Sequence, residues 1–224
     1  TLAIAADCPL GIHGMRLRTT SGISNLVTFH VGTLTETAET EPNSEFEAPQ
    51  VVEPGVVVSG VVRNEDVDYY AFEVARGTPI SIEVEGLRLG RSFFDPVLIL
   101  YNPEGNEVAR CDDLPLLRQD AAVSVIAERD GRYIVELRES AYRGSDDADY
   151  RLHIGSFPRP AMVYPPGGQV GSEVKLAWIA RQHVRCRRTK VGRQHNGKED
   201  DGNLSVSFVQ GLKLDHLRAF TDNF

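Results

Sequence analysis

Apolar and polar residues alternate with a period of two along much of the chain. The clearest runs begin at Tyr70, Ile80, Tyr133 and Tyr150, each with apolar side chains at every second position. Successive side chains of a β-strand point to opposite faces, so each run predicts a strand with one buried and one solvated face. The run Pro96–Tyr101 is apolar at every position, which is typical of a central strand.

Turn signals rich in Gly, Pro, Asn and Asp separate these runs. They lie at Arg76–Pro79, Asn102–Asn106, Arg129–Gly131 and Arg143–Asp147. Short strands at this spacing, with no convincing amphipathic helix among them, predict an all-β fold. We expect an antiparallel β-sandwich, jelly-roll-like, over residues 50–156.

The flanks predict partial β segments. Gly14–Thr19 and Asn25–Val31 read as a hairpin that ends a preceding β-domain within residues 1–32, and residues 33–49 read as an acidic linker. Residues 157–180 form a Pro/Gly connector and the first strand of a following β-domain. Residues 181–224 are a basic tail whose fold the pattern does not reveal. We expect the chain to be an excerpt of a longer protein.

Composition and charge narrow the function classes. The net charge is −8, which argues against a general nucleic-acid binder because phosphate contacts need a basic surface. The charge is split: residues 1–180 carry 15 Lys/Arg against 27 Asp/Glu, and residues 181–224 carry 9 against 5. Three cysteines are too few for a disulfide framework. The sequence contains no run of eighteen apolar residues, so it predicts no membrane-spanning helix.

Two oxygen-rich clusters frame the entry to the strand at Tyr70. The first runs from Glu39 to Asn43, and the second runs from Asn64 through Asp68. Ca²⁺ takes six to eight oxygen ligands from carboxylates, amides and backbone carbonyls. If the strands bring the two clusters together, they would form a calcium site; the alternative is a solvated acidic linker with Asp68 in a turn.

Many short pieces of the chain carry a resemblance to a known family. They include Glu39–Asn43, Val58–Val61, Asp66–Val74, Phe94–Tyr101 and Asp130–Tyr133, in that order and at characteristic spacing. With Asp149–Leu152, they make residues 39–155 resemble the bacterial pre-peptidase C-terminal domain. That family is a β-sandwich found beside secreted peptidases and in large cell-surface proteins.

The collagen-binding domains of clostridial collagenases resemble the same fold, and this resemblance implies which residues hold calcium. Their site uses a Glu-x-Glu-x-Asn linker and an Asp before paired tyrosines. The matched positions here are Glu39, Glu41, Asn43 and Asp68. Glu65 stands where that site has a further Asp, so its role is open, and the neighbouring Asp66 could serve instead. Collagen binding does not follow from the shared fold.

The resemblance implies a non-catalytic, calcium-stabilised module of a secreted or cell-surface bacterial protein. Its role would be binding, adhesion or spacing, with an extracellular protein, a polysaccharide or a neighbouring domain as partner. We expect a monomeric module. The alternative is an accessory domain of a secreted peptidase or other hydrolase that presents substrate to an active site outside this chain. Residues 11–32 and 165–179 resemble the end and the beginning of immunoglobulin-like repeats.

Other candidate sites are weaker, each with a plainer explanation. A second acidic group, Asp95, Asp112, Asp113 and Asp120, is more typical of solvated loop ends and Asx turns than of a metal site. In the tail, His183, Cys186 and His195 offer only three zinc ligands, and the basic run 181–193 suits a solvated tail better than a nucleic-acid contact.

No catalytic motif stands out in the sequence. Glu139 with the acidic run 146–149 could pose as acid and base, but surface loops of acidic proteins commonly look like this. Four tyrosines could instead form a ligand-facing strip: Tyr69, Tyr101, Tyr142 and Tyr164. The histidines at 13, 30 and 153 and Cys111 are expected to be structural.

Overall fold

The structure, a computed structural model, describes residues 1–179 except 115–116, 118, 158–161, 172 and 176. The described residues fall into two units, residues 1–35 and residues 36–179. Within the described residues there is no helix with the length and apolar character needed to cross a membrane. The tail candidates, the basic run 181–193 and the possible zinc ligands, lie outside the described residues.

The first unit contains a hairpin, as the sequence predicts. Strand β1 (Gly11–Met15) pairs antiparallel with β4 (Val27–Val31), and the short strands β2 (Arg18–Thr19) and β3 (Gly22–Ile23) extend it around the turn. A separate pair, β15 (Met162–Tyr164) and β16 (Ala177–Ile179), lies in the region predicted to hold a connector and a following strand.

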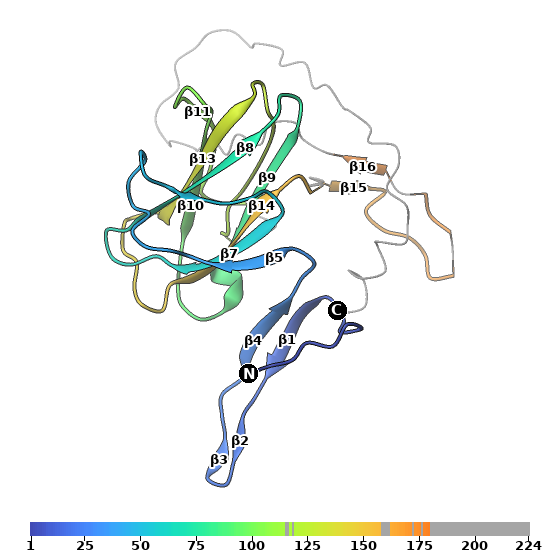
Figure 1. Ribbon diagram of the computed structural model, residues 1–224. Helices are drawn as coiled ribbons and strands as arrows, with labels where there is room; N and C mark the ends of the chain where they lie inside the picture. The colour runs from blue at the N-terminus through green and yellow to red at the C-terminus, as the bar shows by residue number, and fades with distance from the viewer. Residues whose placement is uncertain (115–116, 118, 158–161, 172, 176, 180–224) are drawn as a thin grey trace, which may run out of the picture. The chain divides into compact units, whose positions relative to one another are not determined.

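Ten strands of the second unit form two five-stranded sheets that lie face to face (Figure 1). The first sheet has the order β11-β10-β13-β8-β6, and its strands are β6 (Gln50–Val51), β8 (Val67–Val74), β10 (Pro96–Tyr101), β11 (Glu107–Cys111) and β13 (Gly131–Glu139). The second has the order β12-β9-β14-β7-β5, and its strands are β5 (Thr35–Ala38), β7 (Val56–Val61), β9 (Pro79–Glu85), β12 (Ala122–Ile126) and β14 (Asp149–Gly155). The all-β sandwich expected from the sequence is therefore confirmed.

The hydrophobic core lies between the two sheets and follows the predicted alternation. Tyr70 and Phe72 of β8 face inward, as do Tyr150, Leu152 and Ile154 of β14, and all five are at most 1% exposed. Strand β10 lies between β11 and β13 and is buried at five of its six positions, so it is the central strand that its apolar run predicts. Between β9 and β10 the chain makes a single 3-10 turn, η1 (Leu87–Leu89).

Two short strands on one side of the sandwich position the candidate site. The predicted linker, residues 33–49, contains a strand: Thr35–Ala38 form β5 at the edge of the second sheet, and the N–H of Glu39 then donates to the carbonyl of Ser59 at 2.9 Å. Strand β6 runs parallel to β8, with Gln50 opposite Tyr70. The chain between these strands is therefore held beside the first half of β8.

Core packing should dominate the stability of the sandwich. Leu98, on the central strand, is fully buried, whereas Val51 on the edge strand β6 is 69% exposed. We expect Leu98→Ala to lower the free energy of unfolding by about 2–5 kcal/mol, because it leaves a cavity in the core. Val51→Ala should change the free energy by less than about 0.5 kcal/mol. Urea unfolding measures both, and equal effects of the two substitutions would contradict the assigned core.

Candidate metal centre

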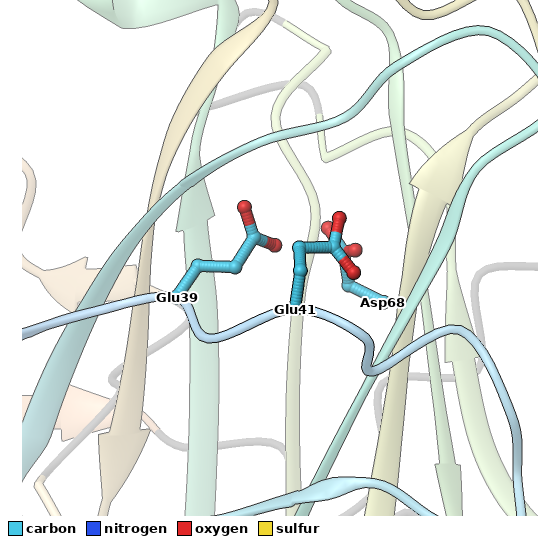
Figure 2. A group of neighbouring side chains, drawn as sticks. All are labelled: Glu39, Glu41 and Asp68. Carbon is cyan, nitrogen blue, oxygen red and sulfur yellow. The ribbon is translucent and has the colours of Figure 1, made fainter.

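Three carboxylates meet at the start of β8. Glu39 and Glu41 come from the segment that follows β5, and Asp68 is the second residue of β8; Figure 2 shows their carboxylates turned toward a common space. One oxygen from each lies within 4.8 Å of the others, the only such acidic group found among the described residues. This is the grouping that the sequence predicts for a calcium site.

Asp68 is the most unusual member of this group. Its side chain is fully buried, and neither carboxylate oxygen has a hydrogen-bond partner. Burial, together with the charges of Glu39 and Asp66, raises the pKa of Asp68 to about 9. A buried charge without a partner costs several kcal/mol, so this carboxyl either keeps a proton or pairs with a cation.

The Glu39 carboxylate, unlike that of Asp68, has several hydrogen-bond partners. Its Oε1 accepts hydrogen bonds from the hydroxyls of Tyr150 at 2.7 Å and Tyr70 at 3.1 Å, and its Oε2 accepts from the N–H of Val61 at 3.1 Å. The two tyrosine hydroxyls also contact each other. Burial and the neighbouring carboxylates raise the pKa of Tyr70, so both hydroxyls are neutral donors at ordinary pH.

Asn43 lies beside the carboxylates and has an oxygen to offer. Its Nδ2 donates to Glu39 Oε1 at 3.4 Å and to Tyr70 at 3.3 Å, while its Oδ1 is buried without a partner. The N–H of Asn43 donates to Glu41 Oε2 at 3.1 Å, which holds the second glutamate next to the first. Asn43 therefore adds an unpaired amide oxygen to the carboxylates, and amide oxygen is a usual calcium ligand.

The two remaining predicted ligands lie differently. Glu65 is exposed, has a left-handed backbone with φ of 61°, and is not in the carboxylate group. Asp66 is near enough for its charge to act on Asp68, but its oxygens accept from Ser44 Oγ and from the N–H groups of Arg63 and Val67. In this structure Asp66 therefore organises the turn before β8.

The second acidic group is not close enough to share one ion, although burial and the charges of Asp95 and Asp112 raise the pKa of Asp113. Asp120 is fully buried and accepts from three successive N–H groups, those of Gly86, Leu87 and Arg88, and from the Arg88 guanidinium at 2.6 Å. Asp95 accepts from the Ser140 hydroxyl at 2.7 Å. Asp120 thus holds the η1 turn and has its charge paired within the protein.

The possible acid–base residues also stabilise loops. Glu139 accepts from the N–H groups of Ala141 and Arg143 at 2.7 and 2.8 Å, and Asp149 pairs with Arg91 at 2.8 Å. Glu139 thus stabilises the loop after β13, and Asp149 forms an ion pair at the start of β14. Cys111 is fully buried, as expected.

Two of the four predicted surface tyrosines meet on the outer face of the first sheet. Tyr69 and Tyr101 both donate to Glu136, at 3.4 and 2.7 Å, and the Phe46 ring lies edge-on to each. Tyr142 lies under the Arg138 guanidinium, 4.5 Å from the ring centroid. The fourth tyrosine, at position 164, belongs to β15, which is outside the two sheets.

Comparison with known proteins finds a family match for part of the sandwich. The sequence signature of the bacterial pre-peptidase C-terminal domain matches residues 66–139, from the turn before β8 to the end of β13. This part of the sandwich is therefore similar to the bacterial pre-peptidase C-terminal domain, in line with the resemblance seen in the sequence, and domains of that family are accessory modules rather than catalytic ones. The matched range includes Asp66 and Asp68 but not Glu39, Glu41 or Asn43.

Several solved structures are similar to part of the chain, among them the three described next, and no curated protein matches it. The pre-peptidase C-terminal domain of a collagenase from Bacillus anthracis is 17% identical in sequence and has a TM-score of 0.34. The match covers 55% of this chain and 99% of the collagenase domain. A periplasmic inhibitor of g-type lysozyme from Aeromonas hydrophila is 15% identical, with coverage of 48% and 98% and a TM-score of 0.36. A surface-associated copper-binding protein of Methylomicrobium album BG8 is 10% identical, with coverage of 55% and 98% and a TM-score of 0.31.

The pKa of Asp68 predicts how the stability of the metal-free protein depends on pH. In the unfolded chain this carboxyl loses its proton near its ordinary value of 3.8, whereas in the folded chain it keeps the proton up to about 9. Between these values the folded state binds more protons than the unfolded state, so stability falls as pH rises. With chelator present, denaturant unfolding of the wild type should show this fall, and Asp68→Asn should not. Parallel pH profiles for the two proteins would contradict the assignment.

The loop carboxylate Asp120 should be essential for stability and unrelated to metal. Asp120→Ala removes the acceptor for three backbone N–H groups and leaves the Arg88 guanidinium without this partner. We expect a loss of about 3–5 kcal/mol, the usual effect of breaking a buried ion pair. Asp112→Ala, in the same predicted group but half-buried, serves as the control and should have a small effect. An equal loss for both would show that Asp120 has no special role.

Proposed function

We propose that the chain carries a non-catalytic module that calcium stabilises, and that this module serves binding, adhesion or spacing beside a partner domain in a secreted or cell-surface bacterial protein. The observation that carries the proposal is the fully buried Asp68, whose two oxygens lack partners next to Glu39 and Glu41. A cation would neutralise this buried carboxyl together with the half-buried Glu39 and the exposed Glu41 beside it.

The donor atoms favour calcium over other common metals. The oxygens available come from Glu39, Glu41, Asp68 and Asn43, and no histidine or cysteine belongs to the group. An all-oxygen set suits a hard cation, and zinc or copper would call for nitrogen or sulfur ligands. Calcium bound here would supply positive charge to the carboxylates and would tie the segment after β5 to β8.

The outer face of the first sheet is the best place for a ligand or a neighbouring domain. Phe46, Tyr69 and Tyr101 present aromatic surface there, next to the charged pair Glu136 and Arg138. Aromatic rings with polar neighbours are frequent in contacts with proteins. Phe46 lies three residues after Asn43, the last proposed ligand of the segment that follows β5. A metal bound there would therefore also help to hold this aromatic surface in place.

Thermal unfolding of the full chain tests the proposal. Calcium at one hundred times its dissociation constant adds about 2.7 kcal/mol to a protein that binds it only when folded. For a chain of this size we expect the midpoint to rise by about 5–10 °C over the value in chelator. Asp68→Asn should abolish the rise and should leave the metal-free protein as stable as the wild type, or more so, because it removes a buried unpaired acid.

Glu65→Gln is the matched control, since it neutralises an exposed acid three residues from Asp68 that lies outside the carboxylate group. It should retain the full calcium response. No response in the wild type would end the calcium proposal, and an equal response in Asp68→Asn would remove that residue from the site.

A further inference from the structure

The sandwich core presents the Glu39 carboxylate to the candidate cation site. Tyr150 and Tyr70 both donate to the same oxygen of Glu39, and the side chains of both tyrosines are at most 1% exposed. Tyr150 belongs to β14 in one sheet and Tyr70 to β8 in the other. Glu39 is therefore fixed relative to both sheets and not only by its own segment.

The absence of a side chain at Gly60 makes room for this arrangement. Gly60 lies opposite Tyr150 in the β7–β14 pairing. A Cβ atom at this position would lie 2.5 Å from Cζ of Tyr150 and 2.9 Å from the carboxylate carbon of Glu39, both closer than real Cβ contacts. Tyr150 is enclosed by the core and cannot move aside without cost, so only glycine fits between the ring and the strand.

In this position the Tyr150 hydroxyl would orient Glu39, a metal ligand, and would not itself bind the metal. A neutral donor to Oε1 orients the carboxylate and leaves its negative charge in place, so Oε2, which accepts one hydrogen bond from the Val61 N–H, keeps a lone pair for a cation. Groups that orient a metal ligand through hydrogen bonds typically change affinity by 10–100-fold when they are removed. The effect comes from preorganisation: without the Tyr150 hydroxyl, Glu39 loses its shortest hydrogen bond and is held less firmly before the metal binds, by Tyr70 and the N–H of Val61.

We propose that Tyr150, with the space left at Gly60, is a positioning residue that sets the calcium affinity of this module through Glu39. The inference rests on the proposed calcium site. In this inference the calcium affinity depends on a core residue that contributes no ligand atom to the metal. That residue lies 111 positions from Glu39 in the sequence.

Calcium titration by isothermal calorimetry on the full chain tests this inference. Tyr150→Phe removes only the hydroxyl and should raise the dissociation constant by about tenfold or more. The matched control is Tyr133→Phe, another buried tyrosine, whose hydroxyl instead contacts the backbone of Arg129. The control should stay within about twofold of the wild type. Gly60→Ala should weaken binding at least as much as Tyr150→Phe if circular dichroism shows it folded.

A double substitution separates positioning from a general loss of stability. In the Glu39→Ala background there is no carboxylate to orient, so adding Tyr150→Phe should cause no further loss of affinity. Tyr150→Phe binding as tightly as wild type, or Tyr133→Phe weakening as much, would overturn the inference while the calcium site itself stands. Wild-type protein that binds no calcium would overturn both, so the two failures are distinguishable.

Discussion

A buried acid without a partner is the constraint on which the site depends. The alternation that turns Tyr70 and Phe72 into the core also turns Asp68 inward, because the three residues share one face of β8. The same strand thus provides two of the largest core side chains and a buried carboxyl without a hydrogen-bond partner. Since a buried charge is costly, the sandwich can gain the full benefit of its packing only when the carboxyl is protonated or neutralised by a cation. Glu39, held by two tyrosines at the same point, makes the need for neutralisation greater.

The sandwich itself was largely predictable from the sequence. Strands β8, β9, β13 and β14 appear where polar and apolar residues alternate, and β10 appears where the chain is apolar throughout, because burial on one or both faces leaves its trace in the sequence. Strand β5 was not anticipated: Thr35–Ala38 is polar, since an edge strand is mostly solvated, and it lay inside the predicted linker. The polar composition of such a segment reflects its exposure to solvent. It does not reveal that the backbone pairs with a neighbouring strand.

The candidate site was predictable only in outline. The grouping of Glu39, Glu41 and Asp68 follows from two clusters that frame one strand, and the structure brings all three together. The separate positions of Glu65 and Asp66 depend on the geometry of a turn, which spacing alone does not reveal. Alternation placed the tyrosines in the core but gave no sign that their hydroxyls meet a carboxylate. That contact depends on how two sheets are aligned across the core.

The span of the contacts around Glu39 has a consequence for the order of folding. Glu39 stands at the edge of the first strand of the sandwich, and Tyr150 stands on its last, β14. Contacts between residues so far apart in sequence form late, because closing the intervening chain costs entropy. A chain still emerging from the ribosome, or one cut before β14, lacks Tyr150, one of the groups that orient Glu39. The cation would therefore bind most tightly to molecules in which the final strand is already paired, and would stabilise the complete domain more than its incomplete forms.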